Sequence, residues 1–367
     1  MIVDIITYVL VLSEDGMEYA IAAIPGDGIG PEVLDAVTPL LEDVAAAEGI
    51  TLAFSEFDWG SERYISEGAM MPDDALDQLV ETDAILLGAV GHPDVPDHVT
   101  LHGLLLPIRK RFNQQVCERP AILFEGVESP LVGYEGGDID ILVFRENTEG
   151  EYSDIGGREH VGFSHEVAIQ TSVFTREGTE AILRAAFERA TERSGHLTSI
   201  TKSNAQAHSM VFWDEVVREV AADFPDVEVE SLLVDAGSMD FIRRPEEFDV
   251  VVASNLFGDI LTDIGAIVTG SMGLAPSANI DPSGRYPSMF EPVHGSAPDI
   301  TGEGIANPVA MVLSAAMMFR NLGEEGASEQ LWTAVRAYLA DTDAPRTPDL
   351  GGAAGTADVI ADLRARL

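Results

Sequence analysis

Residues 248–263, with the sequence FDVVVASNLFGDILTD, constrain the fold of this chain more than any other stretch. Val250 to Ala253 form a short and continuous apolar run, which is typical of a strand buried on both faces of a sheet. A Ser–Asn turn follows, and then a helical pattern that carries Asp259 and Asp263. The segment therefore predicts a buried strand that leads directly into a helix with two carboxylates on it.

The two aspartates suggest a metal site. They lie four residues apart, so a helix places them side by side on one face. Like charges at this spacing repel each other unless a cation lies between them, and Mg²⁺ and Mn²⁺ prefer oxygen ligands. The sequence favours a site for a divalent metal, although a solvated acidic helix face explains the same spacing in a chain this acidic.

Strands and helices alternate along the chain. Apolar runs predict buried strands at residues 19–24, 84–90 and 197–201, and amphipathic periodicity predicts helices at residues 177–193 and 209–223. This alternation is typical of an α/β fold with a largely parallel sheet.

Three polar residues lie just past predicted strands, namely Lys202 after residues 197–201, Asp235 after residues 232–234 and Asn255 after residues 250–253. Open α/β sheets bind ligands beyond the carboxyl ends of their strands. We therefore expect a ligand site near these residues.

The charge of the chain limits its partners. The formal net charge is −42 at pH 7, which argues against nucleic acid or an anionic membrane as a partner because both would be repelled. Lysine occurs only at positions 110 and 202. An acidic excess with almost no lysine indicates a protein of a halophile, in which molar salt screens the self-repulsion of the chain. The hydrophobic content of 46% excludes disorder.

Length and cysteine content indicate class and compartment. A chain of 367 residues predicts about two domains. Cys117 is the single cysteine, which excludes an internal disulfide and fits a cytoplasmic location. No apolar stretch reaches the roughly 20 residues of a membrane span. Residues 1–16 lack the basic start and cleavage site of a signal peptide, so we interpret them as an N-terminal extension ahead of a natural start at Met17.

Two other motifs carry less weight. Residues 26–30, GDGIG, follow the first predicted strand, but their G-x-G-x-G spacing differs from the dinucleotide-binding fingerprint G-x-G-x-x-G, so a tight turn is the better interpretation. His98 and His102 lie four residues apart, as two zinc ligands on a helix do. No third ligand lies nearby, and we expect the proline-rich loop at residues 91–99 to interrupt such a helix. The sequence therefore argues against a zinc site.

Long motifs then point to a family. IPGDGIGPE, RENTEGEY, SNLFGDILTD and FEPVHGSAPDITGEGIANP occur in this order. With them, the chain from Tyr19 to its C-terminus resembles the metal-dependent β-decarboxylating 2-hydroxyacid dehydrogenases, the family of isopropylmalate and isocitrate dehydrogenases. Within this family, MMPDDAL, GAVGHPDVPDHV, RENTEGEYSDIGGR and TKSN are most similar to the tartrate and D-malate dehydrogenase branch.

The resemblance implies a two-domain fold around a central twisted mixed sheet flanked by helices, rather than a standard Rossmann fold. Residues 17–114 together with residues 270–367 would form a large cofactor-binding domain. Residues 115–269 would form a small domain that holds the substrate and metal residues and makes the dimer contacts.

The resemblance also implies roles for charged residues. The carboxylates of a small anionic 2-hydroxy diacid would be bound by three arginines, Arg109, Arg119 and Arg145. Mg²⁺ or Mn²⁺ would be bound by Asp235, Asp259 and Asp263. Asp235 would contact the substrate as well.

Two residues would transfer protons. An unprotonated Lys202 would take the proton of the 2-hydroxyl group, and Tyr152 would protonate the enolate that remains after decarboxylation. In the family, Lys202 and Asp235 come from the second subunit, so the resemblance implies a homodimer with shared active sites.

The cofactor would bind at the HGSAPDITGEGIAN segment rather than at GDGIG. The residues implied are His294, Gly295, Ser296, Ala297, Asp299, Ile300 and Asn307. The carboxylate of Asp299 would accept hydrogen bonds from free ribose hydroxyls and repel a 2′-phosphate, so we expect NAD rather than NADP. Ile300 would fill the neighbouring apolar slot.

Residues just before Arg109 bear on the choice of substrate. Isocitrate enzymes place a serine where this chain has Gly103, and isopropylmalate enzymes place a glutamate where it has His102. Both departures favour a smaller acid, so we expect conversion of D-malate to pyruvate and CO₂, oxidation of tartrate, or both. Leu105 and Leu106 would accommodate an isopropyl group, which keeps 3-isopropylmalate as the alternative.

Two other function classes are less consistent with the motifs. A hydrolase or another metal enzyme would use the aspartates without a nicotinamide site, and the HGSAPD segment argues against it. An acidic binding protein would leave Tyr152 and Lys202 without a role.

Overall fold

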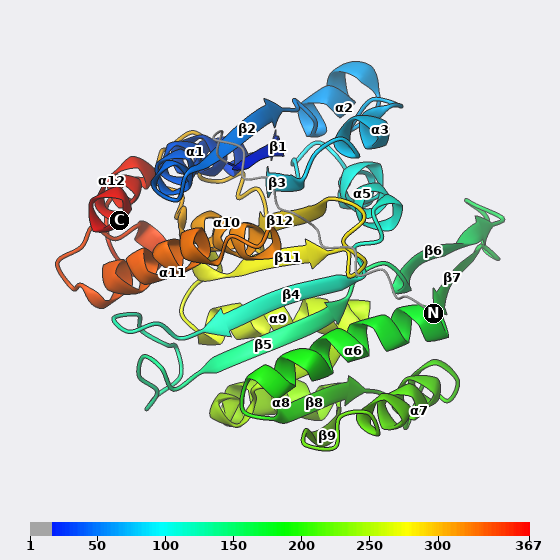
Figure 1. Ribbon diagram of the computed structural model, residues 1–367. Helices are drawn as coiled ribbons and strands as arrows, with labels where there is room; N and C mark the ends of the chain where they lie inside the picture. The colour runs from blue at the N-terminus through cyan, green and yellow to red at the C-terminus, as the bar shows by residue number, and fades with distance from the viewer. Residues whose placement is uncertain (1–16) are drawn as a thin grey trace, which may run out of the picture.

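The computed structural model in Figure 1 describes residues 17–367, so the expected N-terminal extension lies outside the described residues. The strands are β1 (Met17–Gly26), β2 (Ile50–Glu56), β3 (Ala84–Ala89), β4 (Val116–Ile122), β5 (Asp140–Glu146), β6 (Gly150–Glu159), β7 (Val167–Val173), β8 (His196–Thr201), β9 (Glu228–Leu233), β10 (Val250–Ala253), β11 (Pro276–Ile280) and β12 (Ser288–Pro292).

The α-helices are α1 (Gly30–Ala47), α2 (Ser61–Glu67), α3 (Ala75–Leu79), α4 (Asp97–Thr100), α5 (Leu106–Arg111), α6 (Arg176–Glu192), α7 (Ser209–Ala221), α8 (Val234–Arg243), α9 (Asn255–Val268), α10 (Val309–Asn321), α11 (Glu325–Ala340) and α12 (Thr356–Arg366). A π-helical turn covers Leu101–Leu105, and short 3₁₀ turns cover Pro245–Glu247, Met272–Leu274 and Pro348–Leu350. None of the helices within residues 17–367 is long and apolar enough to cross a membrane.

Ten strands form one mixed sheet in the order β2-β1-β3-β12-β11-β4-β5-β10-β8-β9. Neighbours are parallel within β2-β1-β3-β12 at one end and within β5-β10-β8-β9 at the other. Between these groups, β11 is antiparallel to β12 and to β4, and β4 is antiparallel to β5. The two parallel groups therefore run in opposite directions. This sheet confirms the expected α/β fold and differs from a standard Rossmann sheet.

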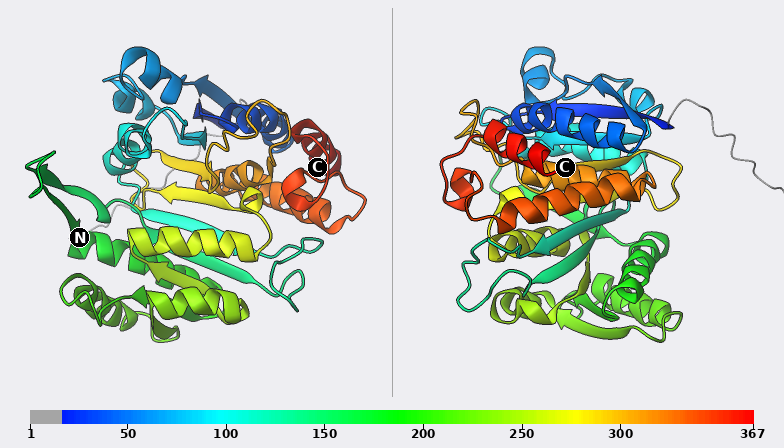
Figure 2. Two further views of the ribbon diagram at one scale, coloured as in Figure 1. Left: turned by 180° about the vertical axis from the view of Figure 1, so that it is seen from behind. Right: turned by 60° about the vertical axis from the view of Figure 1, so that its left-hand side comes forward.

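Helices cover both faces of this sheet. Around β5 and β10, α6 and α7 lie on one face, and α8 and α9 lie on the other (Figures 1 and 2). The buried side chains in this half form one core, which includes Phe144 and Trp213. In the other half, α1 lies against β1 and β3, α10 lies against β12 and β11, and α11 and α12 pack on these two helices. Their buried side chains form a second core, which includes Phe319 and Tyr338. The alternate residues of β1 and β3 belong to a third core, which includes Trp59 and Ile108.

β6 and β7 form a separate two-stranded sheet, an arm that projects from the body of the molecule (Figures 1 and 2). Large apolar side chains are exposed along this arm, namely Ile155, Val161, Phe163, Val167 and Ile169. A two-stranded sheet is marginally stable by itself in water, and exposed apolar patches usually mark contact surfaces. The arm is therefore a candidate surface for contact with another chain.

The first segment singled out in the sequence folds as predicted. β10 covers Val250–Ala253, all of them buried, and α9 begins at Asn255. Lys202 follows β8 directly, and Asp235 lies in the first turn of α8. The sheet therefore places these residues at the ends of neighbouring strands.

Candidate active site

Several elements converge on Asp259, near the start of α9. Arg119 of β4 and Arg145 of β5 each direct Nη1 to Asp259 Oδ1, at 3.4 Å for Arg119. Tyr152 of β6 donates a hydrogen bond to Asp259 Oδ2 at 3.0 Å. The antiparallel pairing of β4 and β5 brings the two arginines together, so the mixed part of the sheet builds this cluster.

Other contacts hold both arginines in place. Arg145 is 3% exposed and donates to Asn255 Oδ1 from Nε at 3.2 Å and from Nη2 at 2.8 Å. Arg119 donates to Thr262 Oγ1 at 2.9 Å and to Ser277 Oγ at 3.3 Å. A guanidinium group fixed at several points is preorganised to bind a carboxylate.

The charges of this cluster set its protonation. Burial raises the pKa of Asp259, but the guanidinium groups of Arg145 and Arg119 outweigh burial and lower the pKa overall. Burial and the charge of Asp259 raise the pKa of Asp263. Burial and the same charge raise the pKa of Tyr152. At neutral pH, Asp259 is therefore an anion and Tyr152 is a protonated phenol that has a proton to give.

Asp259 and Asp263 suit a divalent cation but do not complete a site for it. Both carboxylates lie on one face of α9, and the pKa of Asp263 is raised by burial first and by the charge of Asp259 second. Asp235 forms an ion pair with Lys202. In the part of the chain that the structure describes, no three His, Cys, Asp or Glu side chains gather closely enough to hold a metal ion. One chain thus brings together two of the three expected metal ligands.

Arg109, on α5, is also placed to bind an anion. It is 4% exposed, and its Nη2 donates to Glu291 Oε1 of β12 at 2.7 Å. Its Nε is buried without a hydrogen-bond partner among residues 17–367. A buried donor without a partner is costly, so a carboxylate that reaches it is bound favourably.

The GDGIG turn supports the expected cofactor loop. Ile29 N donates to the backbone oxygen of Ser296 at 2.9 Å. A Cβ on Gly28 would lie only 2.0 Å from that oxygen, and Gly28 has a φ of 60°, so glycine is required there. The segment is a tight turn, as the sequence predicts, and it positions the loop around Ser296.

A pocket of about 400 Å³ lies beside this loop and suits one half of a dinucleotide. The residues that line it include His294, Ile300, Asn307, Ile29 and Asp349. His294 Nε2 is buried without a partner in the described chain, and burial lowers the pKa of His294, so the ring is neutral. Asn307 Nδ2 is held by Asp349 Oδ2 at 2.9 Å. A pocket lined mainly by apolar side chains, with one polar atom that lacks a partner, suits an adenine base better than it suits a charged group.

Gly295, Ser296 and Ala297 line a second pocket, of about 640 Å³, with the loop at residues 90–97. Asp299 is exposed at the edge of the same loop. Six of the seven expected cofactor residues thus line two neighbouring pockets, and Asp299 lines neither of them.

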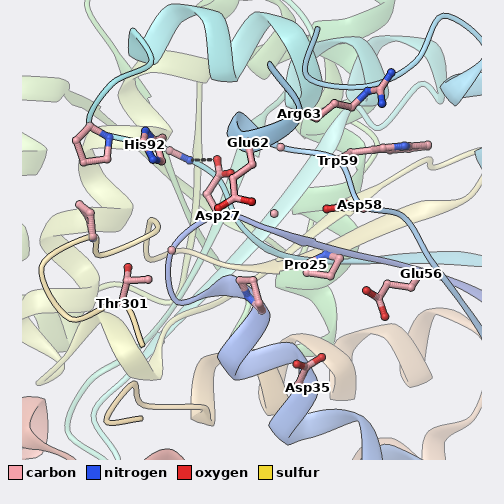
Figure 3. A pocket seen from close by; sticks show the side chains of 17 residues that line it. Pro25, Asp27, Asp35, Glu56, Asp58, Trp59, Glu62, Arg63, His92 and Thr301 are labelled. Carbon is pink, nitrogen blue, oxygen red and sulfur yellow. Dashed lines mark hydrogen bonds between the residues drawn. The ribbon is translucent and has the colours of Figure 1, made fainter. Parts of the chain in front are cut away.

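Figure 3 shows a third pocket, of about 560 Å³, on the other side of the GDGIG turn. Its acidic lining includes Asp27, Asp35, Glu56, Asp58 and Glu62. The carboxylate of Asp27 is occupied because it accepts hydrogen bonds from Ser61 and Gly91. So much negative charge opposes a pyrophosphate or an acid substrate, which agrees with the cofactor assignment away from GDGIG.

The family follows from comparison with known proteins. A family model described as isocitrate/isopropylmalate dehydrogenase matches residues 20–363. The chain belongs to the isocitrate/isopropylmalate dehydrogenase family. Among solved structures of this fold, the isocitrate dehydrogenase of Methylococcus capsulatus is similar with a TM-score of 0.86 and 34% identity, covering 95% of this chain and 99% of that one.

Two relatives are more similar in sequence to this chain than that isocitrate dehydrogenase is. The chain is 49% identical to a Bacillus subtilis protein named probable tartrate dehydrogenase/decarboxylase, over 95% of this chain and 98% of the relative. It is 51% identical to the D-malate dehydrogenase (decarboxylating) of Escherichia coli, over 92% of this chain and 96% of the relative. These similarities agree with the expected branch of the isocitrate/isopropylmalate dehydrogenase family.

The helix before Arg109 corrects one expectation. Residues 97–111 form a continuous helical segment, so His98 and His102 do share a helix, and the predicted interruption is wrong. Pro96 lies just before this segment, and the π-helical turn precedes Pro107, where the missing N–H would otherwise break an α-helix. Within residues 17–367, no third His, Cys, Asp or Glu side chain joins these two histidines in a group that could hold a metal ion.

Positions 102 and 103 have specific surroundings in this family member. His102 pairs with Asp154 of β6, with Nδ1 and Oδ2 3.5 Å apart. A Cβ on Gly103 would lie 2.5 Å from Cγ of Met70, which is 2% exposed. The serine that isocitrate enzymes place at position 103 therefore has no room beside Met70.

Sequence reasoning missed three acidic residues that hold the site together. They are Glu291, which contacts Arg109; Asp349, which contacts Asn307; and Glu151, which contacts the start of α9. Glu291 lies inside the FEPVHG motif and Glu151 lies inside the RENTEGEY motif. Their places in these motifs could have identified them as candidate site residues. Asp349 could not have been singled out from the sequence, because it lies outside these motifs in a chain that is rich in aspartate.

Proposed function

We propose that this protein is an NAD- and divalent-metal-dependent dehydrogenase that oxidises and decarboxylates a small 2-hydroxy diacid. D-malate, which yields pyruvate and CO₂, is the substrate that we favour, and tartrate is the second. One observation carries the proposal. Arg119, Arg145 and Tyr152 converge on Asp259 in a chain that is 49% and 51% identical to relatives named for tartrate and D-malate.

The arginines are suited to exchange partners when an acid binds. In the chain alone, Asp259 balances Arg119 and Arg145. A substrate carboxylate offers the guanidinium groups a bidentate partner and frees Asp259 for a cation. When bound at Asp259 and Asp263, Mg²⁺ or Mn²⁺ supplies positive charge beside the hydroxyl and carboxylate of the acid. This exchange keeps the buried charges paired before and after binding.

Protons and hydride have separate routes in this proposal. Lys202, acting from the partner subunit, takes the proton of the 2-hydroxyl group. His294–Asn307 would hold NAD, which would supply the acceptor for the hydride of C2. After CO₂ leaves, Tyr152 gives its proton to the carbon that carried it, and its raised pKa keeps that proton available at neutral pH. The exposed carboxylate of Asp299 favours NAD over NADP.

We also propose a homodimer that shares its active sites. α8 and α9 lie side by side on one face (Figure 2) and expose large apolar side chains, namely Met239, Ile242, Ile260 and Ile267. Such a patch, with the apolar arm, fits a second copy of this chain. Ile260 is adjacent to Asp259, so a copy packed there brings the partner subunit's Asp235 toward the metal. The proposed division into residues 17–114 with 270–367 and residues 115–269 is supported by the core around Phe144 and Trp213, whose buried residues all lie within 115–269.

The surroundings of the helical segment at residues 97–111, just before and including Arg109, favour the small acids as substrates. Met70 leaves no space for a serine at position 103, so the γ-carboxylate of isocitrate lacks its partner. The alternative, 3-isopropylmalate, relied on Leu105 and Leu106. Leu105 packs against the core around Ile108, so this packing accounts for a leucine at position 105 without a role in substrate binding. D-malate needs only the arginines and the cation.

The test uses purified protein in molar KCl with Mn²⁺, NAD and D-malate. NADH and CO₂ should appear in equal amounts, and removal of the metal by EDTA should stop both. If no 2-hydroxy acid yields NADH, the proposal fails, and a metal enzyme of another class becomes the better interpretation.

A further inference from the structure

Pairing with β7 does not hold Tyr152 in position. The ladder between β6 and β7 pairs Gly150 with Val173 and resumes at Ile155 with Thr171, so residues 151–154 have no partner in it. A stretch outside the ladder gains its position from side-chain contacts. Tyr152 lies within this stretch.

Glu151, the neighbour of Tyr152, binds the start of α9. Ser254 is the N-cap residue of α9, but its side chain makes no cap hydrogen bond to its own helix. Its Oγ donates to Glu151 Oε1 at 3.0 Å, and Leu256 N donates to Glu151 Oε2 at 3.2 Å. Both carboxylate oxygens of Glu151 therefore close the amino end of the helix that carries Asp259. An acidic group is favoured there by the unpaired N–H groups and the helix dipole.

The other contacts of this stretch are weaker anchors. Ser153 Oγ donates to the backbone oxygen of Thr171, an exposed contact on the arm. Asp154 reaches His102, with 63% and 40% of the two side chains exposed. Exposed pairs of this kind contribute little. Ser254, in contrast, is fully buried.

We infer that Glu151 is a positioning residue that fixes Tyr152 against Asp259 by tying β6 to the first turn of α9. This inference rests on the proposed function, because it concerns the proton that Tyr152 donates. Without Glu151, residues 151–154 keep the exposed contacts of Ser153 and Asp154, and Tyr152 keeps only its own contacts with Asp259 and Arg145. We expect these to be too few to hold the phenol near the reacting carbon. We expect substrate binding to change little, because Glu151 contacts none of Arg109, Arg119 and Arg145, and Arg145 keeps its own bonds to Asn255.

Glu149 offers a matched control on the same loop. Its carboxylate accepts hydrogen bonds from Thr175 N and Thr175 Oγ1, each at 2.8 Å, at the start of α6. Glu149 and Glu151 thus make the same kind of contact with two different helices. A general loss of stability should follow from either change, whereas displacement of Tyr152 should follow only from the change at Glu151.

The experiment compares Glu151→Ala, Glu151→Gln and Glu149→Ala with the unmodified protein on D-malate. We expect Glu151→Ala to lower kcat by about 100-fold, the typical cost of a misplaced catalytic group, while KM changes by less than about threefold. Glu151→Gln keeps one acceptor oxygen and should recover about tenfold of that loss. Glu149→Ala should lower the melting temperature but keep kcat within about threefold.

Crystal structures of the two alanine variants make the outcome independent of the substrate. In Glu151→Ala, the Tyr152 hydroxyl should lie beyond hydrogen-bond distance of Asp259, and in Glu149→Ala it should stay in place. An unmoved Tyr152 in Glu151→Ala overturns the inference, as does an equal loss of kcat in both alanine variants. If the unmodified protein oxidises no acid, the proposed function fails, and the two structures still decide the role of Glu151.

Discussion

Asp259 has several tasks at the scale of a single residue. It balances Arg119 and Arg145, accepts the Tyr152 hydroxyl and shares a helix face with Asp263. Its arginine and tyrosine partners lie 107 to 140 positions away in the chain. Local spacing therefore predicted the aspartate pair, but it could not show that Arg119, Arg145 and Tyr152 meet at Asp259.

Asp259→Asn should abolish turnover and leave the fold intact. The amide keeps the shape of the side chain but removes the charge that binds the cation, which should raise the barrier by several kcal/mol. Arg145 retains its two hydrogen bonds to Asn255, so the cluster stays folded. The measurement is kcat at saturating Mn²⁺, with circular dichroism as the check on folding.

Asp43→Asn is the control for this change, since Asp43 forms a surface ion pair with Arg364. Exposed pairs contribute at most about 1 kcal/mol, so this variant should keep its activity. If Asp259→Asn retains kcat within about threefold of the control, Asp259 is not a metal ligand.

Local patterns were sufficient for some elements and not for others. The apolar run at Val250–Ala253 gave the bounds of β10, because a strand buried on both faces leaves a continuous signal. The antiparallel strands β4 and β11 were not foreseen, since strand direction is set by partners distant in sequence. The start of the helical segment, at residues 97–99, was assigned to a loop because Pro93 and Pro96 lie just before it, and the π-helical turn that follows has no sequence signal.

Gly103→Ser should destabilise the protein through Met70. The new Cβ would lie 2.5 Å from Met70 Cγ and 3.1 Å from Met70 Cβ, atoms close to the backbone that cannot move aside freely. Overpacking of this kind costs about 1–3 kcal/mol. In Met70→Ala, the same serine should cost much less, so the two changes should be strongly non-additive. Thermal unfolding of both single variants and the double variant in molar KCl measures this coupling, and additive effects would show that Met70 does not restrict position 103.

At the scale of the whole molecule, a large negative charge is combined with the proposed assembly of two chains into a dimer. The net charge of −42 acts within each subunit and between subunits. The apolar surfaces of α8, α9 and the arm oppose this repulsion. Salt and assembly are therefore coupled in this account.

Low salt should weaken both the fold and the dimer. The Debye length is about 10 Å at 0.1 M salt and about 2 Å at 2 M, so repulsion between acidic surfaces is screened only in concentrated KCl. Melting temperature and molar mass by light scattering should both fall between about 2 M and 0.1 M KCl. If the melting temperature and the molar mass do not change across this range, the acidic charge does not make the fold and the dimer depend on salt.

Shared active sites predict complementation between two inactive variants. In a mixed dimer of Lys202→Ala and Asp259→Asn, one site receives Asp259 from the first chain and Lys202 from the second, and is intact. Subunits unfolded together and refolded at equal amounts should recover about one quarter of the activity, since half the dimers are mixed and each has one intact site. Sites contained within single chains would show no recovery.

The ratio of kcat/KM for D-malate, 3-isopropylmalate and isocitrate, measured under one salt and Mn²⁺ condition, tests the central claim most directly. We predict that D-malate exceeds 3-isopropylmalate and far exceeds isocitrate, because the γ-carboxylate of isocitrate would stay unpaired beside Gly103 and Met70 at a cost of about 1–3 kcal/mol. Some activity with 3-isopropylmalate is expected, since apolar contacts discriminate by only about 10- to 200-fold. A value for 3-isopropylmalate about tenfold or more above that for D-malate would contradict the account and assign the protein to the isopropylmalate branch.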